Sequence, residues 1–258
     1  ASFSPTASFP GAMAAIATGR GGVGGDAAFD SILDSGSGGA GTGGTARISI
    51  GGASQVDVGT IGVFAGATSG NVGAGSPNFG GTGIVTGGNA SIAINTSSTV
   101  AADFITVSAN AVTYETSRTG NATAGTASVT ISNGTVTLDE VEVSANAFLG
   151  TEFGQNVGSI NGMSAGTNTG GTANLSVAGG TLTANRANVT STAVGVGQQR
   201  TDVNDVTENS AIEQALAGGG GSGGNATFAI SGGSANFAET LLVDASGRGG
   251  NGYINADS

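Results

Sequence analysis

The stretch Gly88–Ala111, GNASIAINTSSTVAADFITVSANA, carries the pattern that decides the fold. Apolar side chains at Ala90, Ile92 and Ile94 alternate with polar or small ones, and a similar alternation follows a Ser/Thr-rich turn. A period of two is typical of a β-strand that buries one face. The stretch therefore predicts strand, turn and strand, with apolar side chains directed toward one core.

The same phrase occurs five times along the chain, with different material between the copies. Each copy is 23 or 24 residues long, and almost all variation in spacing lies between the copies. A repeated unit of this kind is the sequence signature of a solenoid, in which each unit buries its apolar face against its neighbours. The copies begin at Gly44, Gly88, Gly125, Gly171 and Gly224.

Each copy reads as about three short strands separated by tight bends. In the third copy, a first strand ends at Asn133–Gly134, where a turn with positive φ is expected. A bend at Asp139–Glu140 then separates two further short strands. We therefore predict an all-β fold, a parallel β-helix with Gly-rich loops and one or two short helices. Matching apolar positions predict three ladders: Ile48/Ile92/Val129/Leu175/Phe228, Ile50/Ile94/Ile131/Val177/Ile230 and Val63/Val107/Val143/Val189/Val243.

The chain divides into an N-terminal lead, residues 1–43, and the repeats, residues 44–258. The lead is expected to hold a partial coil that closes near Met13–Thr18, and Pro5 and Pro10 before it disfavour an interior strand.

Two short helices are expected outside the repeated phrase. Asp26–Asp34 places apolar residues on one helical face, and Ser210–Ala217, within the excursion 195–223, begins with a capping box. The Gly-rich separators between copies either form additional coil or project from it. We favour a mixture, in which the shorter separators complete coil and the longest projects.

Composition excludes several classes of function. The chain has 258 residues with 51 Gly, no Cys, His or Trp, and a net charge of −11 from 17 acids and 6 basic residues, all Arg. Nucleic-acid binding requires a basic stripe, which this chain lacks. Nucleophilic triads and His-based metal sites are also excluded. Membrane insertion is not expected, because no apolar run approaches the about 18 residues needed to span a bilayer.

Paired carboxylates are the remaining route to catalysis, and the best cluster is Asp139, Glu140 and Glu142. General acid–base chemistry needs two carboxyl groups in one cleft with separated pKa values. Neighbouring copies place Asp103–Phe104 and Asn185–Arg186 at the same bend, so no carboxylate ladder forms. We therefore predict no catalytic residue and no enzymatic activity.

Calcium is the one cofactor that the sequence brings into consideration. Gly21–Asp26, GGVGGD, matches the start of a calcium-binding GGxGxD repeat. Such sites need consecutive stacked repeats, whereas the match occurs once. Asp26 is therefore a weak calcium candidate, and no other cofactor is expected.

The phrase GRGG occurs near both ends of the chain, at residues 19–22 and 247–250, each time just after a closing strand. The chain thus starts and stops near the same phase of the repeat. Uncapped solenoids expose open strand edges that invite pairing. We therefore expect head-to-tail association of copies, or continuation into a longer array, with the assembly ends at Gly19, Arg20, Arg248 and Gly249.

The copies open with small residues, then Asn or Thr, then Ala, and two apolar residues in alternating positions follow. They close with a five-residue pattern: an apolar residue, a residue of any type, Val, a polar residue and Ala. This pattern, over roughly residues 44–252, resembles bacterial β-strand-repeat surface proteins, the filamentous-haemagglutinin-like and autotransporter-like adhesin passengers. The resemblance implies a right-handed parallel β-helix, secreted or displayed on a bacterial cell surface. It also implies a role in adhesion, extracellular filaments or biofilm matrix, with cell-surface glycans as further partners. The alternative is a carbohydrate-binding or carbohydrate-degrading β-helix, similar to a tailspike or lyase.

Overall fold

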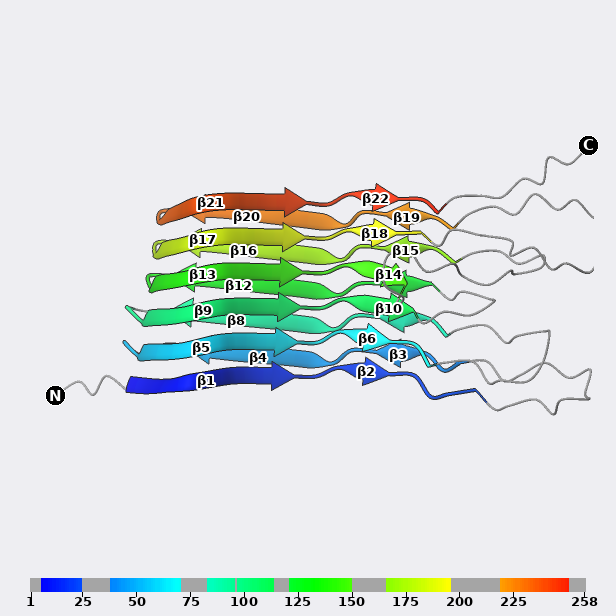
Figure 1. Ribbon diagram of the computed structural model, residues 1–258, viewed down its shortest axis with the longest axis horizontal. Helices are drawn as coiled ribbons and strands as arrows, with labels where there is room; N and C mark the ends of the chain where they lie inside the picture. Colours follow the sequence, from blue (N-terminus) through cyan, green and yellow to red (C-terminus); the bar gives the residue numbers. More distant parts are fainter. Residues whose placement is uncertain are drawn as a thin grey trace, which may run out of the picture.

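The computed structural model describes residues 6–24, 38–70, 83–95, 97–113, 121–149, 166–195 and 219–250. Regular structure in these ranges is β-strand throughout, and all pairings between named strands are parallel. Four sheets stack their strands in sequence order, so the chain is a parallel β-solenoid (Figure 1). The predicted all-β fold and β-helix architecture are therefore confirmed.

Two sheets contain the long strands. Sheet A consists of β1 (Thr6–Ile16), β5 (Gln55–Phe64), β9 (Thr99–Ser108), β13 (Thr135–Ser144), β17 (Thr181–Thr190) and β21 (Ser234–Asp244). Sheet D consists of β4 (Thr45–Ile50), β8 (Asn89–Asn95), β12 (Thr126–Ser132), β16 (Thr172–Ala178) and β20 (Asn225–Ser231).

The other two sheets contain short strands. Sheet B consists of β2 (Gly19–Arg20), β6 (Ala67–Thr68), β10 (Ala111–Thr113), β14 (Ala147–Leu149), β18 (Ala193–Val194) and β22 (Gly247–Arg248). Sheet C consists of β3 (Gly41–Thr42), β7 (Val85–Thr86), β11 (Ala122–Thr123), β15 (Asn168–Thr169) and β19 (Gly221–Ser222).

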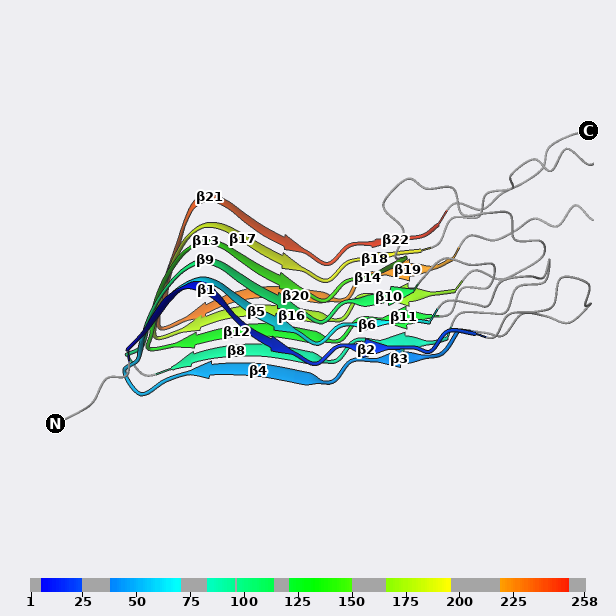
Figure 2. The ribbon, with the colours of Figure 1, turned by 60° about the horizontal axis from the view of Figure 1, so that its bottom comes forward.

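A complete coil passes through sheets C, D, A and B, so it has four strands where the sequence predicted about three. The prediction differs at two places. The segments on either side of Asp139–Glu140 form one bent strand, β13, instead of two. The ends of the separators add the short strands of sheets B and C. Figure 2 shows the bend, because sheet A arches while sheet D runs nearly straight.

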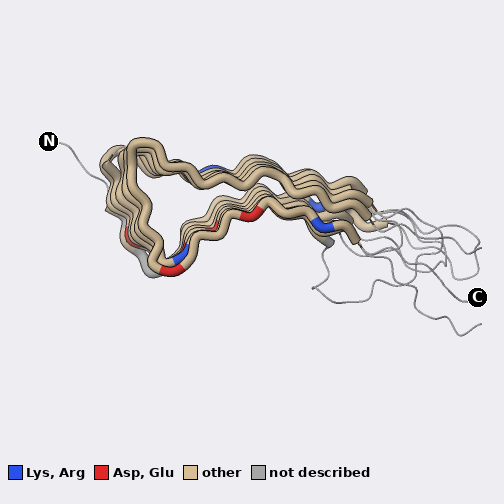
Figure 3. The backbone as a smooth tube through the Cα atoms, turned by 90° about the horizontal axis from the view of Figure 1, so that it is seen from above, with Lys and Arg blue, Asp and Glu red and all other residues tan. Residues whose placement is uncertain are grey.

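The strand register confirms the three predicted ladders. In sheet D, Ile94 pairs with Ile131 and Ile131 pairs with Val177, and all three side chains are buried. In sheet A, Val107 pairs with Val143 and Val143 with Val189. The ladders face each other across the space between sheets A and D. We call this part of the coil the wide compartment, and Figure 3 shows it at the broad end of the cross-section.

Sheets B and C lie close together in the remainder of the cross-section, which we call the narrow limb (Figure 3). Its interior contains small side chains such as Ala67, Ala111 and Ala147, which are buried. A Cβ atom added to Gly41 in sheet C would lie 2.0 Å from the carbonyl oxygen of Thr68 in sheet B. The two backbones therefore approach too closely there for any side chain.

The glycine that opens each repeat lies at the boundary between the two parts. Its N–H donates across the coil to a carbonyl oxygen at 2.7–2.8 Å, which draws the two sides of the chain together. A Cβ on Gly125 would lie 1.9 Å from the carbonyl oxygen of Gly88 in the preceding coil. The donor and acceptor pairs are Gly44 to Ala17, Gly88 to Ala65, Gly125 to Ala109, Gly171 to Ala145 and Gly224 to Ser191.

Tight turns join sheet D to sheet A at the opposite edge of the coil. The predicted positive φ is present in the third repeat, where it falls on Asn133 at 59°. Gly179 and Gly232 take the same role in the next two repeats, with φ of 81° and 73°. Asn and Gly suit these positions because they adopt the left-handed conformation at low cost.

The N-terminal lead differs from the prediction, because β1 begins at Thr6 and continues through Pro10. Two features make proline acceptable. Strand β1 pairs only with β5 among the described strands, so it is an edge strand. The paired register also skips from Phe9 to Ala12, so Pro10 lies where the ladder is interrupted.

Several predictions concern residues outside the described ranges. These are the helices at 26–34 and 210–217, Asp26, and the middle parts of the separators. The described ends of the separators do contribute to the coil, as the strands of sheets B and C.

Candidate functional site

The separators are all attached at one edge of the solenoid, the outer end of the narrow limb. Each of them follows a strand of sheet B and precedes a strand of sheet C. Their attachment points lie side by side: Gly70 N donates to Gly39 O at 3.0 Å, and Gly250 N donates to Gly219 O at 2.8 Å. The scaffold therefore presents its most variable sequence along one edge and tight turns along the other.

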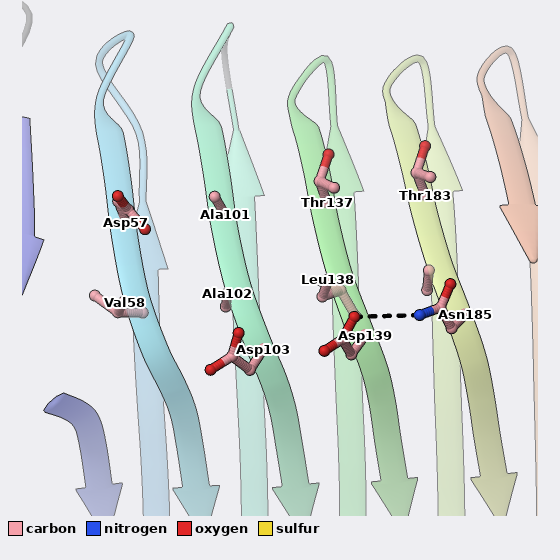
Figure 4. Close-up of a pocket in the computed structure, with 11 residues that line it drawn as sticks. Asp57, Val58, Ala101, Ala102, Asp103, Thr137, Leu138, Asp139, Thr183 and Asn185 are labelled. Carbon is pink, nitrogen blue, oxygen red and sulfur yellow. Dashed lines mark hydrogen bonds between the residues drawn. The ribbon is translucent and has the colours of Figure 1, made fainter. Parts of the chain in front are cut away.

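A shallow hollow lies on the outer face of sheet A, at the bend of β5, β9, β13 and β17 (Figure 4). The side chain of Asn185 donates through Nδ2 to Oδ1 of Asp139 at 3.2 Å. Carboxylate, hydroxyl and amide groups line the hollow together with small apolar side chains. The lining residues are Asp57, Val58, Ala101, Ala102, Asp103, Thr137, Leu138, Asp139, Thr183, Ala184 and Asn185.

The bend explains this row of polar groups. The register pairs Leu138 with Ala102 and Glu140 with Phe104, so the residue between them makes no ladder pair. Asp103, Asp139 and Asn185 occupy this position in three successive coils, and all three are exposed. The structure thus places the bend residues of neighbouring repeats together, as the sequence indicated. The repeat pattern did not indicate Asp57, which lies two positions earlier in its coil.

The three acids Asp139, Glu140 and Glu142 do not converge on one point. Asp139 bonds to Asn185, whereas Oε1 of Glu140 accepts a hydrogen bond from Nδ2 of Asn188 at 2.9 Å. Partial burial raises the pKa of Glu142, and the neighbouring charge of Glu140 raises it further. Among the described residues, no group of three or more Asp or Glu side chains is arranged to hold a metal ion.

The two ends of the solenoid are the other candidate surfaces. Gly19 and Arg20 form β2 at one end of sheet B, and Arg248 lies in β22 at the other, followed by Gly249. Sequence reasoning marked these four residues as assembly ends, and the structure places the two pairs at opposite ends of the stack (Figure 1).

Apolar side chains are exposed at both ends of the described stack. Val243 of β21 is 43% exposed, whereas Val189 at the same ladder position in the preceding coil is fully buried. Leu241, another core-facing residue of β21, is 40% exposed. At the opposite end, Ile16 of β1 is 68% exposed, but its ladder position is held by Phe64 and Ser108 in the next coils and alternates with the buried core positions. An unpaired strand edge beside such residues is a surface that favours pairing with another strand.

A scan against protein-family models, a search of curated proteins and a search of solved structures each find no match to this chain. In the described ranges there is no helix with the length and apolar character required to cross a membrane.

Proposed function

We propose that this chain is an extracellular structural protein, a β-solenoid subunit or segment that self-associates into a fibre, a surface layer or an adhesin stalk. One observation carries the proposal: at both ends of the described stack, strands β1 and β21 have a described partner on one side only. Core-facing Leu241 and Val243 are exposed at one of these ends, and Met13 and Ala15 are only partly buried at the other. Covering these residues removes apolar surface from water, which favours association. Like many solenoids, the fold also offers an extended surface.

The resemblance to bacterial β-strand-repeat surface proteins supports the proposed setting, secretion or display on a bacterial cell surface. In that setting the separators, which are attached along one edge, serve as the contact surface for a host or for cell-surface glycans. We propose adhesion and participation in a biofilm matrix as the roles of this arrangement, with the coils as scaffold and the separators as variable contacts.

Electron microscopy and light scattering of the purified full chain test self-association. We expect filaments one solenoid wide. The protein concentration needed for their assembly should rise strongly in a Leu241→Lys variant, because that change places a charge on the exposed end. Phe104→Lys is the matched control, since Phe104 is 45% exposed but lies on an inner coil. A chain that stays monomeric at all concentrations contradicts the proposal, as does equal weakening by both changes.

The hollow on sheet A favours a second candidate, a carbohydrate-binding or carbohydrate-degrading β-helix. Thr137, Thr183 and Asn185 offer hydrogen bonds to sugar hydroxyls beside Asp103 and Asp139. A panel of bacterial polysaccharides, tested for binding and for chain shortening, separates the two functions. Depolymerisation by soluble monomers, lost in an Asp103→Ala, Asp139→Ala variant and retained in Asp244→Ala, would replace the structural proposal.

A further inference from the structure

The two end strands of sheet A share a feature that the inner strands lack. Strands β1 and β21 have 11 residues each, whereas the four strands between them have 10. The register locates the extra residue between Phe9 and Ala12 in β1, and between Phe237 and Thr240 in β21. Each is a β-bulge that follows the fourth residue of its strand, at the bend.

The correspondence extends beyond the bulge. Thr6–Gly22, TASFPGAMAAIATGRGG, and Ser234–Gly250, SANFAETLLVDASGRGG, align without a gap. Both segments include the bend, the long strand of sheet A, a two-residue connection and the short strand of sheet B. The two ends of the solenoid therefore present strand edges with the same spacing of every element.

We propose that the β21–β22 end of one copy pairs in parallel with the β1–β2 end of a second copy, in the register that places Ser234 opposite Thr6 and Gly250 opposite Gly22. This inference rests on the proposed self-association and specifies its geometry. A bulge placed on a bulge keeps the strands in register on both sides of the bend.

The pairing continues the ladders of the wide compartment. Met13 and Ala15 of β1 pair with Ile61 and Val63 of β5, so in the junction they lie opposite Leu241 and Val243 of the first copy. Met13 and Ala15 already pack against the core from one side. Pro10 does not prevent the pairing, because it lies where the ladder of sheet A is interrupted.

The strand count defines which sheets take part. Among the described residues, sheets A and B have six strands each, whereas sheets C and D have five. The junction is therefore continuous through sheets A and B and is one strand short in sheets C and D. No described strand of the first copy lies directly opposite β4 of the second copy, the strand that carries Arg47.

The register also stacks Arg20 of one copy on Arg248 of the other, and both side chains are exposed. Like charges directly opposite each other in a sheet are destabilising. We expect Arg248→Glu to lower the concentration needed for assembly by about three- to tenfold. A double variant, Arg20→Glu with Arg248→Glu, restores repulsion and returns the concentration to the original value.

Arg47→Glu is the control, because it changes the net charge equally but lies on β4, outside the junction. Equal effects of Arg47→Glu and Arg248→Glu would overturn the register, since net charge alone would then explain them.

Disulfide trapping tests the register directly, because the chain has no cysteine. Directly paired strands place Cα atoms about 5 Å apart, within the range that a disulfide spans. We expect mixed Ser8→Cys and Asn236→Cys variants to cross-link on oxidation, whereas each variant alone and the pair Thr18→Cys with Asn236→Cys do not. Filaments without the 8–236 cross-link overturn the register and leave self-association standing. Absence of any assembly overturns both proposals.

Discussion

The wide compartment and the narrow limb of each coil are built on the same kind of parallel ladder, yet they are filled in different ways. The compartment is packed by side chains such as Ile94, Ile131 and Val177, and its ladder positions accept Ile, Val, Leu or Phe from coil to coil. In the limb the two backbones approach so closely that Gly41 has no room for a Cβ. Buried Val85 and Ala122 take the place of Gly41 in the next two coils, so the room for a side chain in the limb differs from coil to coil. In the compartment, by contrast, every coil supplies a large apolar side chain at the ladder positions.

The largest effect is expected at the boundary between the two parts. Gly125→Ala places a Cβ 1.9 Å from the carbonyl oxygen of Gly88, and backbone atoms cannot move aside cheaply. We expect a loss of at least about 4 kcal/mol in the free energy of unfolding, measured by urea denaturation. Gly22→Ala is the matched control, because a Cβ there meets nothing within 4 Å. Similar losses in both variants would contradict the requirement for close backbone approach.

A large effect is also expected from the compartment. Ile131→Ala removes a fully buried side chain and leaves a cavity between sheets A and D. Substitutions of this type cost about 2–5 kcal/mol in unfolding free energy. Ile16→Ala provides the comparison, since Ile16 is 68% exposed and its truncation in the isolated chain should have little effect on thermal denaturation. If Ile131→Ala left the unfolding free energy unchanged, packing in the wide compartment would not be the main source of stability.

A smaller effect is expected where sheet A passes into sheet B. The side chain of Asn146 accepts from Thr192 N at 2.8 Å and donates to Thr190 Oγ1 at 3.0 Å, while Asn146 N donates to Asn110 Oδ1 at 2.7 Å. Asn146→Ala leaves partly buried groups without partners, at a cost of about 1–3 kcal/mol. Asn89 is exposed, so Asn89→Ala should shift the midpoint of urea denaturation much less than Asn146→Ala does. Equal shifts in the two variants would show that the hydrogen bonds of Asn146 add no stability.

The smallest effect is expected on the outer face of sheet A, and it depends on pH. The pKa of Glu142 is raised in the folded chain, so the folded state binds a proton more readily than the unfolded state. Stability should therefore rise as pH falls from neutral toward the ordinary carboxyl pKa. Glu142→Gln should be slightly more stable than the original chain at pH 7, and the difference should vanish near pH 4. Thermal denaturation of both chains at pH 7 and near pH 4 measures this difference in stability. A difference that is the same at both pH values would contradict a raised pKa of Glu142.

The sequence predicted the features of this protein that depend on the alternation of side chains. Ile92 and Val129 were assigned to one ladder, and the structure pairs them. The turn at Asn133 followed from the low cost of positive φ for Asn. The bend residues Asp103 and Asp139 were aligned correctly because the repeats share one spacing. All of these are local rules applied to a repeated phrase.

The sequence did not predict the narrow limb or the extent of β1. The strands of sheets B and C are mostly two or three residues long, too short for a periodic pattern to emerge. Pro10 indicated only that this segment is not an interior strand, and β1 is an edge strand among those described. That a strand nevertheless runs through Pro10 depends on the interrupted ladder, which is seen only in the assembled sheet.

The amino-acid sequence by itself thus determined that this chain is a parallel solenoid, because period-two alternation and internal repetition act through neighbouring residues. The tertiary structure decided how a coil closes, where the polar hollow lies on sheet A, and that the two end strands share one bulge. The physical reason is that the approach of sheet B to sheet C and the matching bulges of β1 and β21 are relations between segments far apart in the sequence, and the alternation within one repeat does not encode them.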